Sequence, residues 1–334
     1  MELLKKLYSI HSHSGREKKM IRFIVYWIKT NVKEARIKVD TMGNIFVTKG
    51  NAETYPCVVA HIDEVHSKKP KDFKVIETSE ILFGWSSGAK DFIGIGADDK
   101  SGVWLSLVSL KKYDNIKVAL FVSEEVGCIG SSKCDLSFFT DCRYILQCDR
   151  RGSDDFITHI GGTELCSKEF IAATGFENYG YHQEMGMMTD VLTLKERGLE
   201  VSCCNISCGY YEPHTSREFT VKSDLLNCLH FVEHIIDTCN EVYPHKYQYT
   251  WNTGFYDDLY DFYYDDVYTL LTNHPDLTFE EICGAFKDYY PQANLQELEM
   301  TYEMAKQDIE YWKSKDYENS QHSTKPRISS GKTT

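Results

Sequence analysis

Five apolar runs in this chain of 334 residues each lead into a histidine or a carboxylate, and this repetition constrains the fold more than any other feature. The five side chains belong to His61, Asp98, Glu124, Asp149 and His214, and the runs before them are CVVA, IGIGA, VALFVS, YILQC and VSCCNISCGYY. A short apolar run bounded by polar residues is typical of a buried strand. Because the carboxyl ends of strands in an open α/β sheet face one crevice, we expect these side chains to lie close together.

A metal site is the chemistry that best fits these side chains. A single pair such as His61 with Asp63 is more often a hydrogen-bonding pair, and Glu124-Glu125 alone is more often a solvated face; the ordered set favours a metal. Imidazole and carboxylate suit Zn²⁺, with Co²⁺ or Mn²⁺ as alternatives, and carboxylates can bridge two ions. Asp63 lies on the same side of its strand as His61 and is placed to orient its ring.

Adjacent carboxylates in a regular strand face opposite sides of the sheet. Both members of Asp98-Asp99, and both members of Glu124-Glu125, can therefore serve one site only if each pair lies in a loop.

Alternating strand and helix patterns predict an α/β fold. Strand-like runs occupy residues 45–48, 56–60, 73–77, 118–123, 144–148 and 201–207. Helical patterns occupy residues 15–30, 102–113, 189–198 and 222–239. Ser14 and Glu17 have the spacing of a capping box before the first helix. We expect a mixed, mostly parallel central sheet with helices on both faces.

The composition changes after about residue 242. Residues 243–268 contain eleven aromatic side chains interleaved with aspartates, and Thr278 with Glu281 forms a capping box before two further helical patterns. We expect a main domain over 1–242, a small helical appendage over 243–316 and a disordered tail over 317–334. The aromatic side chains of the appendage either pack internally and against the main domain, or roof a cleft, or form an oligomer contact.

The charge balance excludes several partners. The chain has 50 acidic residues against 37 lysines and arginines, a net charge of −13, and no basic patch is evident along the sequence. We therefore expect neither nucleic acid nor a membrane surface as a partner. The twelve cysteines form no paired C-x-x-C elements, and the first residues lack a signal-peptide pattern. These features favour reduced, buried thiols and a cytoplasmic protein.

The ordered motifs resemble a known family. SHSGREK, AHID, GADDKSG, SEEVGCIGS, an aspartate after an apolar strand, TDV and HTSREF occur in that order over about residues 9–240. This series resembles the co-catalytic di-zinc exopeptidases, which include peptidase T and related aminopeptidases and deacylases. The resemblance implies two zinc ions per chain, the first held by His61, Asp98 and Asp149 and the second by Asp98, Glu125 and His214.

The resemblance also implies roles for two further residues. Glu124 would be the general base that deprotonates a metal-bridged water, and Asp63 would orient His61. The peptide bond between Asp98 and Asp99 is expected to be cis.

The chain departs from the family where a lid would be inserted. Only 64 residues separate Asp149 from His214, too few for the inserted domain of peptidase T. Arg150 and Arg217 are candidate replacements for the basic residues of a lid, with surface ion pairs as the alternative. Asp190 is a candidate partner for a free substrate amine, with a helix N-cap as the alternative.

The leading hypothesis is a zinc-dependent aminopeptidase or small-peptide hydrolase with peptide substrates, and a homo-oligomer is compatible with it. A metal-dependent deacylase or carboxypeptidase-like amidohydrolase is the first alternative. A non-catalytic binding protein on the same fold is the second, although such a protein would have no use for Glu124 as a base.

Overall fold

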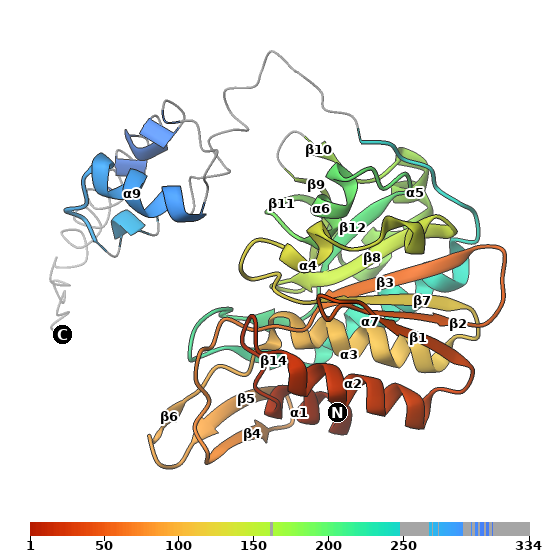
Figure 1. The fold of residues 1–334 in the computed structure, drawn as a ribbon, viewed down its shortest axis with the longest axis horizontal. Coiled ribbons are helices and arrows are strands. Elements are labelled where there is room, and N and C mark those ends of the chain that lie inside the picture. Colours follow the sequence, from red (N-terminus) through yellow and green to blue (C-terminus); the bar gives the residue numbers. More distant parts are fainter. Residues whose placement is uncertain are drawn as a thin grey trace, which may run out of the picture. The chain divides into compact units, whose positions relative to one another are not determined.

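The computed structural model of the chain divides into two compact units, Met1–Tyr249 and Thr250–Thr334 (Figure 1). It describes residues 1–160, 163–247, 267–268, 270–272, 274–289, 295, 298–299, 301–303, 305–306 and 309.

A central sheet organises the first unit. Its strand order is β1-β2-β7-β3-β8-β12-β9-β10, and β11 pairs with β9. The strands are β1 (Ala35–Val39), β2 (Ile45–Lys49), β3 (Tyr55–His61), β7 (Ile116–Phe121), β8 (Cys142–Arg150), β9 (Asp155–Ile160), β10 (Thr163–Glu164), β11 (His182–Gly186) and β12 (Cys203–Ser207). The neighbours β7, β3, β8 and β12 are mutually parallel, whereas β1 and β2 pair antiparallel with their neighbours. Strand β9 pairs antiparallel with β12 and β10 and parallel with β11. The predicted mixed sheet with a parallel centre is therefore confirmed.

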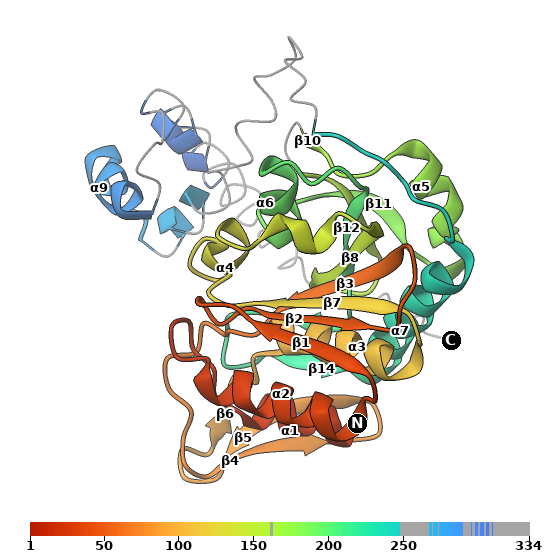
Figure 2. The same cartoon turned by 45° about the vertical axis from the view of Figure 1, so that its right-hand side comes forward.

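Helices cover both faces of this sheet (Figures 1 and 2). The helices of the unit are α1 (Glu2–Ser9), α2 (Lys18–Asn31), α3 (Ala97–Lys112), α4 (Ile129–Ser132), α5 (Lys168–Thr174), α6 (Asp190–Glu196) and α7 (Lys222–Thr238), with short 3-10 turns at Leu136–Phe139 and Phe176–Tyr179. In both views α3 and α7 lie on one side of the sheet and α4 and α6 on the other. Every residue of β3 and β7 is buried, as expected of parallel strands covered on both faces.

A second, smaller sheet was not predicted from the sequence. It has the order β13-β14-β5-β4, and β6 pairs with β5. Its strands are β4 (Phe73–Glu77), β5 (Ile81–Ser86), β6 (Asp91–Phe92), β13 (Tyr210–Tyr211) and β14 (Phe219–Val221). Only β4 was expected as a strand, since β6, β13 and β14 are too short to give a periodic signal. His214 lies in the loop that connects β13 and β14 of this sheet.

The predicted capping box before α2 is wrong. The helix begins at Lys18 with Glu17 as its N-cap residue, and Ser14 donates its hydroxyl hydrogen to Asp63 instead. Glu17 accepts a hydrogen bond from the backbone N–H of Gly15. Ser14 therefore bonds a residue distant in sequence, whereas its spacing from Glu17 had predicted a hydrogen bond at the start of the helix.

Eleven of the twelve cysteines are free thiols, and all eleven are buried. Cys203, Cys204 and Cys208 lie in or beside β12 as core residues, as the sequence predicted. No helix in the described part of the chain is long and apolar enough to cross a bilayer.

The second unit contains α9 (Phe279–Tyr289) and a small apolar cluster. The predicted capping box is confirmed here, because Thr278 and Glu281 each accept a hydrogen bond from the backbone N–H of the other. The cluster comprises Val267, Leu271, Ile282, Phe286, Leu298, Tyr302 and Ala305. Most of the aromatic segment over 243–268 and the whole predicted tail over 317–334 lie outside the described residues.

Candidate metal centre

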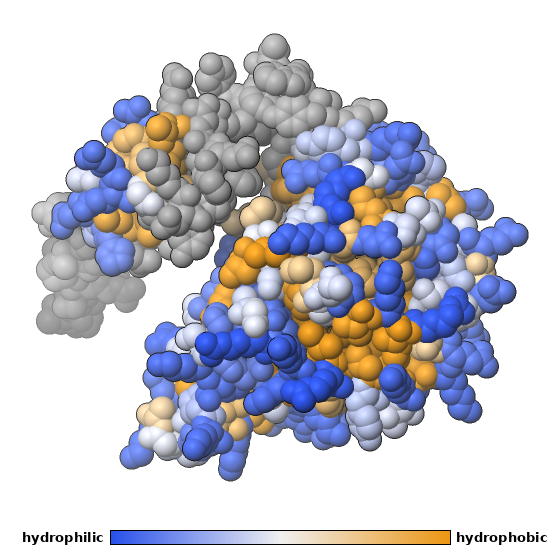
Figure 3. Space-filling model, in the orientation of Figure 1, coloured by the Kyte–Doolittle hydropathy of each residue, from blue (hydrophilic) through white to orange (hydrophobic). Residues whose placement is uncertain are grey.

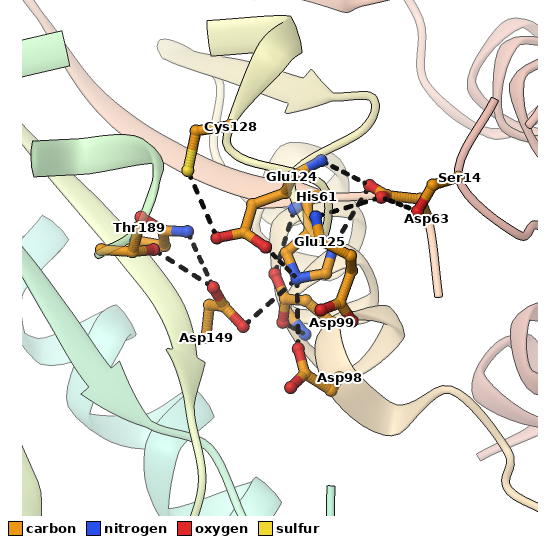
Figure 4. A network of polar contacts seen from close by, with 12 residues as sticks. Ser14, His61, Asp63, Asp98, Asp99, Glu124, Glu125, Cys128, Asp149 and Thr189 are labelled. Atoms are coloured by element: carbon orange, nitrogen blue, oxygen red, sulfur yellow. Dashed lines mark hydrogen bonds and ion pairs between the residues drawn. The ribbon is translucent and has the colours of Figure 1, made fainter. Parts of the chain in front are cut away.

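His61, the last residue of β3, lies at the centre of the first group of predicted ligands (Figure 4). Its Nε2 atom is 3.1 Å from Asp98 Oδ1 and 3.5 Å from Asp149 Oδ1. One ligand atom from each of the three residues lies within 4.8 Å of the other two. Asp149 comes from the end of β8 and Asp98 from the start of α3, so the predicted side chains converge. The strand predicted before Asp98 is wrong, because residues 93–96 form no regular secondary structure.

A second group shares Asp98 with the first. His214 Nε2 is 3.3 Å from Asp98 Oδ2 and 3.1 Å from Glu125 Oε2, and these three residues again offer atoms within 4.8 Å of one another. Glu125 follows β7 and His214 follows β13, where its φ of 63° is left-handed. The five predicted ligands therefore form two adjoining groups with one carboxylate in common.

The peptide bond between Asp98 and Asp99 is cis, as the resemblance implied. Neither residue has helical backbone angles, and their carboxylates take different partners. Asp99 accepts hydrogen bonds from the backbone N–H groups of His61, at 3.1 Å, and Gly102, at 2.9 Å. A glycine is required at Gly102 because a Cβ atom there would lie 2.3 Å from Asp99 Oδ1. Asp99 therefore fixes the backbone while Asp98 faces the imidazoles.

Glu218 holds the backbone around Asp98 and was not identified from the sequence. Its buried carboxylate accepts hydrogen bonds from the N–H groups of Asp98, at 3.1 Å, and Gly96, at 2.6 Å. His66 Nε2 lies 3.2 Å from the same carboxylate. The sequence could have indicated Glu218 through its place in the HTSREF motif, four residues after His214.

Four side chains fix Asp149, and none was predicted to do so. Gln147 and Thr189 donate to its Oδ2 atom at 3.1 and 3.2 Å, and the hydroxyl of Tyr210 donates to Oδ1 at 3.4 Å. Asn205 accepts from the backbone N–H of Asp149 at 2.9 Å. Such outer hydrogen bonds keep a carboxylate in the orientation that a metal requires. Gln147 lies on β8 with Asp149, but Thr189, Asn205 and Tyr210 come from elements distant in sequence, where no spacing reveals them.

Asp63 organises the loop that carries the two glutamates. Its carboxylate accepts hydrogen bonds from the backbone N–H groups of Glu124 and Glu125, at 3.0 and 3.2 Å, and from the Ser14 hydroxyl at 2.7 Å. Its Oδ1 atom lies 3.4 Å from Nδ1 of His61. Burial raises the pKa of Asp63, but these partners outweigh burial and hold it below its ordinary value. Asp63 therefore stays ionised beside the ring that it was predicted to orient.

Glu124 lies at the edge of the first group without belonging to it. Its Oε2 atom is 3.8 Å from His61 Nε2, and its Oε1 atom accepts a hydrogen bond from the thiol of Cys128 at 3.5 Å (Figure 4). Burial raises its pKa well above the ordinary value, against the charge of His61, and Asp149 and Asp190 raise it further. A buried carboxyl with a raised pKa is suited to accept and return a proton.

The balance of charge shows that the residues fit divalent cations. Burial raises the pKa of Glu125 to about 7 and that of Asp149 to about 6, and in both cases the charge of Asp98 adds to the effect. Hydrogen bonds to Asp98 and Glu125 raise the pKa of His214 to about 11. Protons on these side chains thus offset the repulsion between closely spaced carboxylates, and bound metal cations would take the place of the protons. The Oε1 atom of Glu125 is buried without a hydrogen-bond partner, as expected of an atom left for a ligand.

The three predicted substrate contacts have different surroundings. Asp190 is fully buried at the start of α6, and neither of its oxygens has a hydrogen-bond partner in the described part of the chain. Thr189 is the N-cap residue of that helix, so the N-cap alternative for Asp190 is wrong. Arg150 pairs with Asp155 at 2.9 Å, whereas Arg217 is exposed.

Glu64, the neighbour of Asp63, forms a buried charge network. Its Oε2 atom is 2.8 Å from the Lys100 ammonium and 3.2 Å from that of Lys69, and Ser12 donates its backbone N–H to Oε1. Burial raises the pKa of Glu64, but the charges of Lys100 and Lys69 outweigh burial and lower it to about 2. The network fixes the N-terminal segment against the start of α3.

We expect this network to make the fold sensitive to acid. A carboxyl with a pKa near 4.5 when unfolded and about 2 when folded stabilises the fold fully above pH 4.5. This contribution is lost as the pH falls towards 2, with about 2 kcal/mol gone by pH 3. Urea unfolding at pH 7 and pH 3 measures the loss. In Glu64→Gln the same pH change should cost about 2 kcal/mol less; an equal cost in both proteins would contradict the assignment.

Comparison with known proteins identifies the fold. No family model matches the chain, and no curated protein matches its sequence. Among solved structures, aminopeptidase PepT from Bacillus cereus matches with a TM-score of 0.57 at 13% identity, over 72% of this chain and 98% of its own. Aminopeptidase APDkam598 from the archaeon Desulfurococcus kamchatkensis matches with a TM-score of 0.56 at 18% identity, over 70% and 93%.

The TET1 peptidase of Pyrococcus horikoshii, described as assembling into a tetrahedron or a large octahedral shell, matches with a TM-score of 0.51 at 16% identity, over 70% of this chain and 98% of its own. The chain therefore has the α/β fold of these peptidases. The resemblance inferred from its motifs is confirmed at the level of the fold.

Proposed function

We propose that the protein is a metal-dependent aminopeptidase or small-peptide hydrolase with two divalent cations, Zn²⁺ being the first choice and Co²⁺ or Mn²⁺ the alternatives. One observation carries the proposal: two groups of ligands share Asp98, and the carboxylate of Glu124 lies beside them without joining either. A non-catalytic scaffold could use the metal ligands but would have no use for a general base. The first cation would be held by His61, Asp98 and Asp149, and the second by Asp98, Glu125 and His214.

Bound cations would supply Lewis acidity, which activates water and polarises a carbonyl. The protein supplies the proton transfer. Glu124 accepts the proton of the attacking water and returns it to the leaving amine, a sequence that its raised pKa favours. Asp63 keeps Glu124 in place through the backbone N–H group and keeps the ring of His61 oriented.

Asp190 is proposed to bind the free amine of the substrate. Its buried carboxylate has no hydrogen-bond partner among the residues that the structure describes, and burial raises its pKa to about 7 against the charge of His61. A substrate ammonium would satisfy both oxygens and restore the ionised form. Arg217, which is exposed three residues after His214, is proposed to bind the carboxylate of a short peptide. Arg150 is a weaker candidate because its guanidinium already forms an ion pair with Asp155.

A mixed pool of free and N-acetylated short peptides tests the function. After incubation with the zinc-loaded protein, we expect mass spectrometry to detect loss of N-terminal residues from free peptides alone, and a chelator to stop it. Hydrolysis of N-acetylated members would instead favour the deacylase. An untouched pool would contradict peptide hydrolysis and favour the binding protein.

Asp190→Asn makes the same assay specific for amine recognition. We expect the variant to raise KM for free peptides about tenfold or more, since a charge-assisted hydrogen bond to the substrate is lost. Asp114→Asn is the control, because it makes the same change at a carboxylate that is 97% exposed and outside the site, and it should leave KM unchanged. Unchanged KM in Asp190→Asn would overturn the role given to this residue.

A homo-oligomer is proposed by analogy with the assembling TET1 peptidase, and light scattering of the purified chain measures it. The cytoplasmic location likewise stays a proposal.

A further inference from the structure

A pocket of about 360 Å³ lies apart from the candidate metal centre, between the end of α1, the start of α2 and the loop before β4. These elements lie side by side in both Figure 1 and Figure 2. Its volume falls in the range of small-molecule sites. The lining residues are Ser9, Ile10, His11, Lys19, Lys69, Pro70, Lys71 and Phe73.

The charge of this lining is opposite to that of the chain. Three of the lining residues are lysines, one is a histidine and none is acidic, although the whole protein has a net charge of −13. Lys19 comes from one basic run of the sequence, and Lys69 and Lys71 come from another some fifty residues later. No basic patch was evident along the sequence because the fold alone brings these two runs together. Figure 3 shows hydrophilic and hydrophobic side chains next to one another on the face that carries α1 and α2.

The lysines at the rim have no ionic partner. Lys19 and Lys71 are exposed, and neither forms an ion pair or a side-chain hydrogen bond within the described residues. Many lysines elsewhere on this acidic chain are paired with carboxylates, for example Lys112 with Glu233 and Lys222 with Glu77. Positive charge at the pocket is therefore left uncompensated by the protein.

Lys69 forms the inner wall of the pocket. Its side chain is 5% exposed, and its ammonium donates hydrogen bonds to the carbonyl of Tyr8, at 2.9 Å, and to Glu64, at 3.2 Å. The ammonium also lies 4.6 Å from the centre of the ring of Phe73, another lining residue. Glu64 is shared with Lys100. Burial, the largest cause, and the charge of Lys100 lower the pKa of Lys69 to about 7, whereas the carboxylates of Glu64 and Glu218 raise it. An anion in the pocket would favour the charged form of Lys69.

The start of α2 contributes Lys19 to the pocket. Lys18 and Lys19 lie in the first turn of this helix of 14 residues, while its N-cap residue, Glu17, already places a buried carboxylate at the helix N-terminus. The helix dipole therefore has an anion nearby within the protein. The pocket and its unpaired lysines are the features that favour an anionic ligand.

We propose that this pocket binds a small phosphate-bearing anion, held by Lys19, Lys69 and Lys71. Lysines bind phosphate as point charges, and the compact tetrahedral group can accept hydrogen bonds from all three at once. The pocket has room for a phosphomonoester as well as for inorganic phosphate. The proposal does not depend on the peptidase function.

Calorimetric titration of the metal-loaded protein with inorganic phosphate and with glycerol 3-phosphate, at constant ionic strength set with chloride, tests the proposal. We expect saturable binding that the double variant Lys19→Ala/Lys71→Ala weakens about tenfold or more, since two charge-assisted contacts are lost. Both side chains are exposed, so the variant should fold. Lys29→Ala, an exposed lysine in the last turn of α2, is the matched control and should bind as the wild type does.

Phosphate bound at the candidate metal centre would be unaffected by the double variant. Equal binding to the wild type and the double variant would therefore overturn the proposal, as would an absence of binding. Tighter binding of glycerol 3-phosphate than of phosphate would identify a phosphomonoester as the source of the anion; the reverse would identify free phosphate.

Discussion

Replacing Glu124 by glutamine should lower kcat for peptide hydrolysis by about 10²- to 10⁴-fold while leaving the bound metal in place, since this is the contribution of a positioned general base. Glutamine keeps the size and the hydrogen-bonding oxygen of the side chain but cannot accept the proton. Glu124 is outside both groups of ligands, so its neutralisation removes no metal ligand. Its backbone N–H, which donates to Asp63, is also unchanged.

The measurement pairs steady-state kinetics with metal analysis of the same sample. Glu125→Gln is the matched contrast, because the neighbouring carboxylate belongs to the second group and its loss should release an ion. The two adjacent substitutions should thus separate loss of chemistry from loss of metal. An active Glu124→Gln protein, or one that has lost metal, would refute the division of roles between these glutamates.

Three of the ligands could be predicted because they follow buried parallel strands of the central sheet. His61 ends β3, Asp149 lies near the end of β8 and Glu125 follows β7, and these parallel neighbours have apolar runs that end abruptly at polar residues. Parallel pairing then places their ends at one edge of the sheet. For β4 even the bounds were correct, since Phe73–Glu77 is limited on both sides by polar residues.

The surroundings of the ligands could not be predicted because they depend on contacts across the fold. Ser14 has the spacing of a helix cap but bonds Asp63, and Glu218, which directly precedes β14 of the second sheet, accepts the N–H of Asp98. Asn205 holds Asp149 from the neighbouring strand. A local pattern specifies which face a residue takes on its own element, whereas these partners require the order of the strands.

The basic pocket illustrates the same limit. Lys19 and Lys69 belong to runs that are each too short to suggest an anion site, and the overall charge argues against one. Only the packing of α2 beside the loop before β4 places them around one hollow. Net charge therefore predicts the behaviour of the whole surface but not of a single pocket.

Substitution of Asp98 should have a larger effect on metal content than substitution of any other ligand. Asp98 is common to both groups, so we expect Asp98→Asn to lose both ions and His214→Ala to lose only the second. His214 is half exposed, with 53% of its side chain accessible, so its removal should leave the fold intact. Elemental analysis after gel filtration would count the ions, with about two per chain expected for the wild type.

Thermal unfolding separates this result from simple misfolding. Ligands that bind only the folded state stabilise it by about 2.7 kcal/mol at a concentration one hundred times Kd. The wild type should therefore lose Tm when a chelator is added, whereas Asp98→Asn should unfold at one temperature with or without it. His214→Ala should keep part of the chelator effect, because His61, Asp98 and Asp149 still form a complete group. If Asp98→Asn kept one ion and His214→Ala kept none, the two groups would not share Asp98 as a ligand.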